Sequence, residues 1–269
     1  MSKEQPRVFI GIPTGPPKKY ALAYMFAALQ NLDWDNKEIH FAVTQYKFKD
    51  DDGFSDYLRK LIDTIDVGGP VYIHWTYLNE IEARTPYLAV LKNKAVLRAA
   101  FLDSDCEYFL MLGGDNPPPR ATIKRLMKLN ADIASGIVYQ RPKRGFGTAS
   151  GGLPLLWRSA WYLHELDKYD LPPEIMDEFR TAFIESSFLI PIILDPNWRR
   201  RKTIEGIAGG DGCILIRRKV LEYIGWYLPK TGYHSEDVNF FTNAMARGFT
   251  TKADLKLHVP HFDPDGSVY

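Results

Sequence analysis

A single acid, Asp115, follows an apolar run in the position where a carboxylate is well placed to bind a ligand. The run, Tyr108 to Leu112, is short and aromatic, which predicts a strand buried on both faces. Gly113 and Gly114 end it, and prolines 117 to 119 lead into a helix that begins near residue 120. Ligands of open α/β sheets bind just beyond the carboxyl ends of strands. The pattern therefore allows a binding role for Asp115, and the alternative is a turn with a polar cap on the next helix.

Two further groups of polar residues could do acid–base or metal chemistry. Glu236 and Asp237 open a predicted helix, where a carboxylate can act as a general base or simply stabilise the helix N-terminus behind an N-cap at Ser235. His258 and His261 follow the last predicted strand, and each could either bind a metal through a ring nitrogen or pack beneath the end of the chain.

The elements that must position these residues alternate between strand and helix. Apolar runs predict strands over 7–12, 39–44, 70–75, 108–112, 131–139, 213–216 and 249–257. Helical spacing predicts helices over 20–32, 54–65, 88–101, 121–129 and 219–224. This order predicts an α/β fold with a mainly parallel central sheet flanked by helices. No GxGxxG follows the first strand, so a standard dinucleotide site is not expected.

The segment from about 140 to 208 departs from this alternation. It begins with a basic, glycine-rich stretch and continues with many aromatic residues. We interpret residues 1–269 as a single domain in which this segment is an elaboration. Its residues Trp157, Trp161 and Trp198 could form the core of an irregular insertion.

Composition excludes several classes of partner. The 269 residues include 34 Lys and Arg against 33 Asp and Glu, a balance that predicts no nucleic-acid or anionic-membrane partner. Cys106 and Cys213 do not have metal-site spacing, which favours a reducing, intracellular setting. No apolar run approaches the roughly 20 residues that span a bilayer, and no signal peptide is evident. We therefore expect a soluble, cytoplasmic protein without a transmembrane segment.

Several of these stretches occur in an order that resembles the family-2-like glycosyltransferases of the GT-A fold. In that family a helix with Arg/Lys-Asn-x-Ala precedes a strand that ends in Asp-x-Asp, and Lys92-Asn93-Lys94-Ala95 followed by YFLMLGGDNPPP is similar. The stretch GDGCILIRRKVL at 210–221, the pair Glu236-Asp237 and a late histidine also match the family's order. The Asp-x-Asp motif falls on Gly113-Gly114-Asp115, so the last acid is present and glycine stands at the first.

The resemblance implies a GT-A fold and transfer of a sugar from a UDP- or GDP-sugar to an acceptor hydroxyl, with inversion, helped by Mn²⁺ or Mg²⁺. It implies Asp115 as the main metal ligand, with His258 or His261 adding a nitrogen, and we favour His258 because it directly follows the last predicted strand. It also implies that the segment at about 140–208 lies on the acceptor side, where Trp157, Trp161 and Trp198 could stack on an acceptor sugar. It implies Asp237 as the general base, with Glu236 as the second candidate. The residues that the resemblance and the strand ends place at the donor are Pro13, Thr14, Lys92, Asn93, Gly113, Gly114, Asp115 and Gly212.

Two alternatives come from other functional classes. Glycine at the first position of the acidic motif favours a non-catalytic protein that binds a nucleotide or a glycan. A nucleotidyltransferase would need a glycine-rich, basic signature after the first strand, and the stretch 13–19 has only one glycine, so we rank it last.

Overall fold

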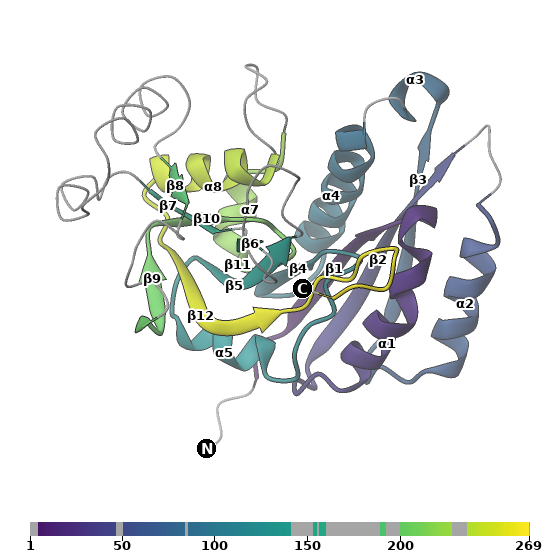
Figure 1. Cartoon of the computed structure of the whole chain (residues 1–269), viewed down its shortest axis with the longest axis horizontal. Helices are drawn as coiled ribbons and strands as arrows, with labels where there is room; N and C mark the ends of the chain where they lie inside the picture. The colour runs from purple at the N-terminus through teal and green to yellow at the C-terminus, as the bar shows by residue number, and fades with distance from the viewer. Residues whose placement is uncertain are drawn as a thin grey trace.

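The central feature of the protein is a mixed β-sheet with helices on both faces (Figure 1). The computed structural model describes residues 5–46, 51–83, 86–140, 153–154, 156–159, 189–191, 200–227 and 236–268. The strand order of the sheet is β3-β2-β1-β4-β11-β5-β12-β9, and β6 pairs with β5. The expected α/β class is confirmed.

The first half of the chain forms the parallel part of the sheet. Its strands are β1 (Val8–Thr14), β2 (Lys37–Tyr46), β3 (Val71–Leu78) and β4 (Tyr108–Leu112). The chain runs outward from β1 to β3 and then returns to place β4 on the other side of β1, with all neighbouring pairs parallel. The strand order therefore reverses between β1 and β4, and such a reversal leaves a crevice at the carboxyl ends of the strands.

The second half adds strands of both directions. These are β5 (Ile133–Gln140), β6 (Leu153–Pro154), β9 (Thr203–Glu205), β11 (Cys213–Arg217) and β12 (Thr251–Val259). Strand β11 is antiparallel to both β4 and β5, with Cys213 opposite Leu112. Its entry at residues 210–212 therefore lies at the edge of the sheet where β4 ends. The predicted parallel pairing holds for β1 to β4 and for β5 with β12, while the reversed β11 carried no signal in the sequence.

Strand β12 contains an irregularity that redirects the chain. It advances from Ala253 to His258 while its partner β5 advances only from Ser135 to Ile137. Additional residues on one strand of a pair bend that strand, and β12 is strongly curved in Figure 1. The bend directs the residues after β12 toward the loop that follows β4.

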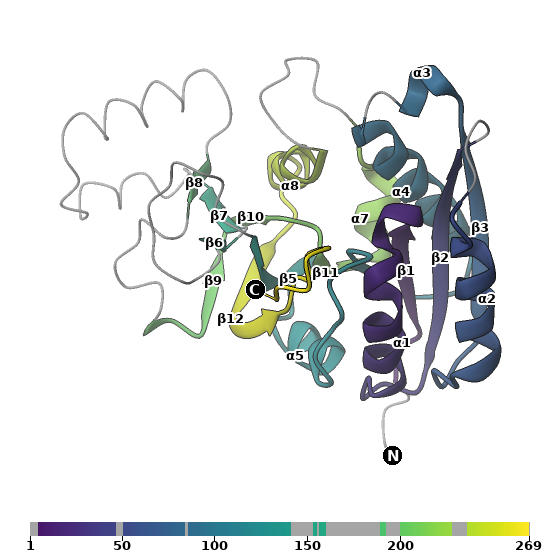
Figure 2. The ribbon, with the colours of Figure 1, turned by 45° about the vertical axis from the view of Figure 1, so that its right-hand side comes forward.

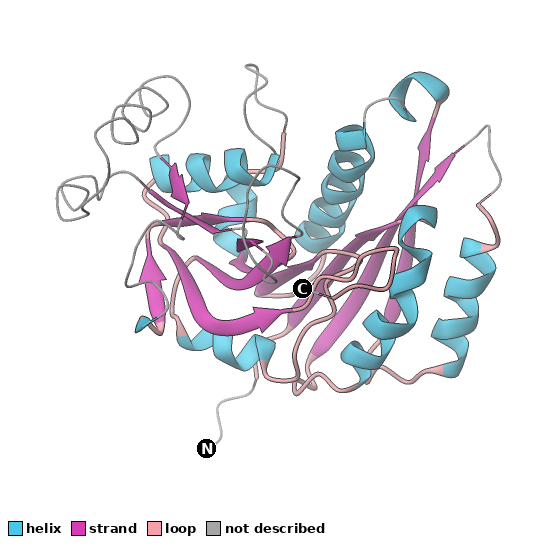
Figure 3. Cartoon of the chain, viewed as in Figure 1, coloured by secondary structure: helices cyan, strands magenta, loops and turns pink. Residues whose placement is uncertain are grey.

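Helices cover the sheet in two layers, each over its own apolar core (Figures 2 and 3). One layer contains α1 (Leu22–Gln30), α2 (Phe54–Thr64) and α5 (Thr122–Lys128). The other contains α4 (Pro86–Asp103), α7 (Arg218–Tyr223) and α8 (Glu236–Ala246). Two short elements, η1 (Pro16–Ala21) and α3 (Glu80–Ala83), complete the described helices. The two cores fix the sheet from both sides, so its carboxyl edge is a rigid base for a site.

A second, three-stranded sheet lies in the predicted elaboration. It consists of β7 (Leu156–Ser159), β8 (Leu189–Pro191) and β10 (Ile207–Gly209). The backbone of Trp157 pairs with Ala208 and Pro191. Trp161, Trp198 and most of the segment 140–208 lie outside the described residues, so the proposed acceptor platform stays a prediction.

Both cysteines, Cys106 and Cys213, are buried free thiols. Over the part of the chain that the structure describes, no helix has the length and apolarity to cross a bilayer.

We predict that a buried histidine makes the fold sensitive to acid. His40 stacks on Phe9 with ring centroids 3.8 Å apart, and its Nδ1 lies 2.9 Å from His74 Nε2. Burial, assisted by His74 and Arg7, lowers the pKa of His40 to about 3 from the ordinary 6.5. Above pH 6.5 the ring is neutral in both the folded and the unfolded chain. As the pH falls from 6.5 toward 3, the unfolded chain binds a proton that the folded chain does not.

The free energy of unfolding should therefore fall by about 1.4 kcal/mol per pH unit below pH 6.5 through this group. Urea unfolding of the wild type and of His40→Phe at pH 7.5, 6.5 and 5.5 measures the effect. His40→Phe should show a shallower decline below pH 6.5 whatever its stability at pH 7.5. Equal declines in the two proteins would contradict the assignment.

Candidate functional site

A cavity of about 470 Å³ opens at the carboxyl edge of the sheet, at the reversal of strand order between β1 and β4. Its walls come from strand ends, from one face of α4 and from the start of α8. The lining residues from strands and their loops include Pro13, Thr14, Thr44, Gly113, Gly114, Asp115, Asn116, Asp211, Gly212 and His261. Helix α4 contributes Val90, Asn93 and Lys94, and α8 contributes Asp237. Most of the residues predicted for donor binding are thus brought to one cavity.

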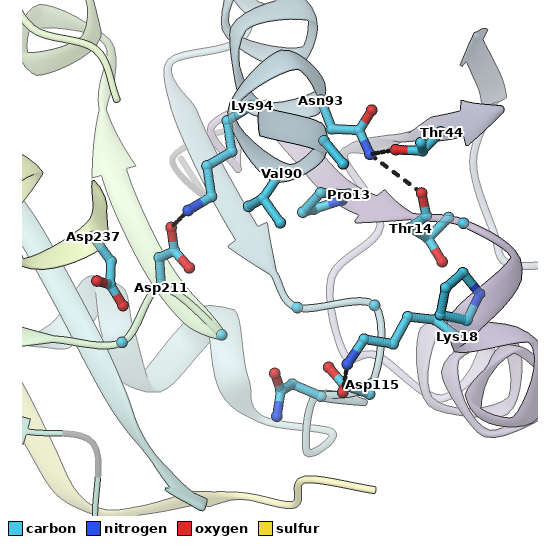
Figure 4. A pocket seen from close by; sticks show the side chains of 18 of the residues that line it. Pro13, Thr14, Lys18, Thr44, Val90, Asn93, Lys94, Asp115, Asp211 and Asp237 are labelled. Carbon is cyan, nitrogen blue, oxygen red and sulfur yellow. Dashed lines mark hydrogen bonds and ion pairs between the residues drawn. The ribbon is translucent and has the colours of Figure 1, made fainter. Parts of the chain in front are cut away.

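Asp115 forms the centre of the first charged cluster in the cavity. Its carboxylate oxygen Oδ2 forms an ion pair with the ammonium of Lys18, which reaches it from η1 (Figure 4). Tyr20 Oη lies 3.4 Å and His261 Nε2 lies 3.2 Å from the same oxygen. The amide of Phe262 donates to the Asp115 carbonyl at 3.0 Å. Asp115 is only 4% exposed, so these contacts compensate a nearly buried charge.

Burial and the charges around Asp115 also shift the pKa values of the neighbouring side chains. Burial and the nearby Lys18 ammonium lower the pKa of His261, although Asp263 opposes this effect. His261 is therefore neutral near pH 7, the form in which an imidazole nitrogen can bind a metal. Burial lowers the pKa of Lys18, with Asp263 opposing, and burial raises the pKa of Tyr20.

Asn116 accounts for the glycine at the first position of the acidic motif. A Cβ at Gly113 would collide with Asn116 Oδ1, and a Cβ at Gly212 would lie 2.6 Å from the same atom. Gly113 N donates to Gly212 O at 2.9 Å, which ties β4 to the entry of β11. Gly114 is constrained from the other side, where a Cβ would lie 2.8 Å from Pro13 O. The two glycines therefore let the ends of three strands approach closely, and an acid at 113 would have to displace the Asn116 side chain.

A second charged cluster surrounds Lys94 on the other side of the cavity (Figure 4). The Lys94 side chain is 1% exposed and forms ion pairs with Asp211 and with Glu236, the latter at 2.9 Å. Burial alone would lower the pKa of Lys94, but the two carboxylates raise it above its ordinary value. Glu236 is thus held in the interior by Lys94, while its neighbour Asp237 lines the cavity. Of the two acids considered as a base, Asp237 has the position from which it can contact a substrate.

Asn93 connects the strand ends beneath the cavity. Its Nδ2 donates to Thr14 O at 3.2 Å and to Thr44 Oγ1 at 2.9 Å, and its Oδ1 accepts a hydrogen bond from Thr76. These contacts use both ends of the amide, so Asn93 holds β1, β2 and β3 in place (Figure 4).

Two residues named from the sequence lie elsewhere. Lys92 is not among the residues lining the cavity, and its ammonium pairs with Glu82 at 2.5 Å. Val90 and Lys94 are four residues apart and share the cavity face of α4, whereas Lys92 is two positions from each of them and projects from another side of the helix. His258 is exposed on β12 and does not line the cavity, whereas His261 meets Asp115 after the strand has ended. Lys18, Tyr20, Lys94 and Asn116 were missed because their partners are distant in the sequence.

The side chains around Asp115 supply only some of the ligands that a divalent ion needs. Within the ranges described here, no cluster of three or more His, Cys, Asp or Glu side chains could hold a metal. Asp115 Oδ2 and His261 Nε2 nevertheless lie 3.2 Å apart, close to the separation of neighbouring ligands around an octahedral ion with bonds of about 2.1 Å. Asp115 and His261 could therefore hold Mn²⁺ or Mg²⁺ together with oxygens of a bound diphosphate and water.

Comparison with known proteins shows the fold. The chain matches no protein-family model and no curated protein sequence. The crystal structure of S. aureus TarS 1-349 with UDP-GlcNAc superposes with a TM-score of 0.51 at 11% identity, covering 94% of this chain and 57% of that chain. Mannosyltransferase PcManGT from Pyrobaculum calidifontis, in complex with GDP-Man and Mn²⁺, gives a TM-score of 0.51 at 15% identity, covering 96% of this chain and 57% of that chain. The chain therefore has the GT-A fold and spans little more than half the length of either structure.

We predict that removing the Lys94 charge strongly destabilises the protein. In Lys94→Met the carboxylates of Asp211 and Glu236 would be left together without a cation, which should cost about 3 to 5 kcal/mol of unfolding free energy. Lys92→Met on the same helix is the matched control, because its ion pair with Glu82 is far more exposed than that of Lys94 and its loss should cost at most about 1 kcal/mol. Urea unfolding measures both, and similar losses in the two variants would refute a special role for Lys94.

We predict that residue 113 must be glycine because the Asn116 side chain occupies the space of a Cβ there. Gly113→Ala should lower the unfolding free energy by about 1 to 3 kcal/mol, because the added methyl group overpacks the junction of β4 and β11. The double variant Gly113→Ala/Asn116→Ala removes the collision. Its loss of unfolding free energy should therefore be smaller than the sum of the losses in the two single variants. Thermal unfolding of the four proteins tests this, and strict additivity would show that the two residues do not compete for space.

Proposed function

We propose that the protein is a glycosyltransferase that moves a hexosyl group from a nucleotide-diphosphate donor to an acceptor hydroxyl. The observation that carries the proposal is the cavity at the strand-order reversal of a GT-A sheet, with Asp115 on one side and Asp211 and Asp237 on the other (Figure 4). The UDP-GlcNAc and GDP-Man bound to the two compared structures support this class of donor.

The nucleotide would lie over the ends of β1 and β2, where Pro13, Thr14 and Thr44 line the cavity. Gly113, Gly114, Asp115 and His261 line the same cavity, so the diphosphate would lie along the loop after β4 and reach Asp115 and His261. When bound there, Mn²⁺ or Mg²⁺ would neutralise charge that develops on the leaving diphosphate. We keep UDP- and GDP-sugars as equal candidates for the donor.

The acceptor hydroxyl must lose a proton as it attacks the anomeric carbon, and Asp237 is the proposed base. Asp237 and Asp115 lie on opposite sides of the cavity (Figure 4). A base on one side and the leaving group on the other would favour in-line displacement, so we propose that transfer inverts the anomeric centre. Lys94 holds Glu236, the residue before the base, and thereby positions the start of α8. The buried free thiols suit a reducing, cytoplasmic setting.

A second candidate is a non-catalytic protein that binds a nucleotide or a glycan. The packing of Asn116 against Gly113 favours it, because Asn116 occupies the space where the side chain of the family motif's first acid would begin. Binding of a donor without hydrolysis or transfer would support this alternative.

Calorimetry with UDP- and GDP-sugars, with and without Mn²⁺, followed by an assay of slow donor hydrolysis, tests the proposal. Asp237→Asn should bind the donor with an affinity within about twofold of the wild type and lose turnover by about 10²-fold or more, because a general base contributes on that order. The exposed Glu222→Asn on α7 is the control and should change neither. Unchanged turnover in Asp237→Asn would remove it as the base, and absence of donor binding by the wild type would refute the function.

A further inference from the structure

Lys18 occupies the position that a divalent ion at Asp115 would need. Its ammonium pairs with Asp115 Oδ2, and this is the oxygen that lies 3.2 Å from His261 Nε2. An ion held by Asp115 and His261 would therefore approach the same oxygen as Lys18. Two cations on one carboxylate oxygen repel each other, so an ion bound there would weaken the contact between Lys18 and Asp115.

Of the two partners, Lys18 is free to move and Asp115 is not. The Asp115 side chain is 6% exposed and contacts Tyr20 and His261, while its backbone carbonyl accepts from Phe262. The Lys18 side chain is 39% exposed and belongs to the short η1 at the rim of the cavity. A lysine also has a long flexible stem with three donor hydrogens, so its ammonium can turn toward another anion nearby.

The charge of the cavity lining favours a movement of Lys18 away from Asp115 when an anionic ligand binds. The described lining contains the lysines Lys18 and Lys94 against the aspartates Asp115, Asp211 and Asp237, a net negative charge when His261 is neutral. Lys94 already forms ion pairs with the carboxylates of Asp211 and Glu236. Against this described lining, a diphosphate would be favoured if Lys18 became available and a further positive charge arrived. A divalent ion on Asp115 would provide both.

We propose that Lys18 exchanges partners. In the empty site its ammonium neutralises Asp115, and in the loaded site a divalent ion takes Asp115 and His261 while Lys18 binds the donor diphosphate. This inference rests on the proposed function and assigns to Lys18 a diphosphate-binding role. It predicts that removing the lysine has opposite effects on the two ligands. Mn²⁺ alone should bind more tightly, because a competing cation is gone, whereas a nucleoside diphosphate in saturating Mn²⁺ should bind less tightly, because a contact to phosphate is lost.

The test compares the wild type with Lys18→Met, which keeps much of the apolar stem. Mn²⁺ binding without nucleotide is followed by the loss of the free-ion electron paramagnetic resonance signal, and UDP and GDP binding in saturating Mn²⁺ by calorimetry. We expect Mn²⁺ affinity to rise and nucleotide affinity to fall, each by about tenfold. Lys19→Met is the matched control, since its ammonium donates to the Asp52 carbonyl, and both affinities should change less than twofold.

Several results would overturn the exchange. Loss of both affinities in Lys18→Met, with circular dichroism showing a folded protein, would make Lys18 a structural residue. Unchanged nucleotide affinity would show that Lys18 does not bind the diphosphate. Equal nucleotide affinity of the wild type in EDTA and in Mn²⁺ would show that no ion displaces the lysine, while the proposed function would still stand. Failure of the wild type to bind UDP or GDP in any condition would instead refute the function itself.

Discussion

Charges can lie in this interior only because each is placed against a partner of opposite sign. Asp115 and Lys94 are both nearly inaccessible to water, and an unpaired ion in either place would be too costly to bury. Their partners come from remote parts of the chain: Lys18 is 97 positions from Asp115, and Glu236 is 142 positions from Lys94. The pairing of Lys94 with Glu236 therefore ties the two halves of the sheet together, while the pairing of Lys18 with Asp115 joins the chain after β1 to the loop after β4.

The fold was largely predictable because buried strands and helices have recognisable patterns of apolar residues in the sequence. The strand at 108–112 and the helix that begins at Phe54 were predicted close to their observed bounds, since continuous apolar runs and helical spacing are local signals. The direction of β11 was not predictable. A short apolar run has the same pattern in a parallel or an antiparallel strand, and the choice depends on where the preceding chain leaves the sheet.

The candidate site was predictable in outline but not in its pairings. Asp115 could be found because it follows a buried strand, and Asp237 because it opens a helix. The motif on α4 drew attention to Lys92 and Asn93, yet Lys92 pairs outside the cavity and Asn93 joins strand ends. Lys18 stands in a stretch that the sequence suggests is an ordinary loop, and its importance emerges only once η1 is placed beside the loop after β4.

The bend in β12 has a consequence for the order in which the molecule forms. The strand begins its pairing with β5 at Thr251, shifts register after Ala253, and pairs again from His258 before the chain reaches His261 and Phe262. These last residues complete the surroundings of Asp115, whereas β1 to β4 can pair without them. Contacts between segments so distant in the sequence form late, since the intervening chain must first be ordered. During synthesis, β1 to β4 could therefore pair well before the cavity is complete, because the surroundings of Asp115 form only when β12 docks.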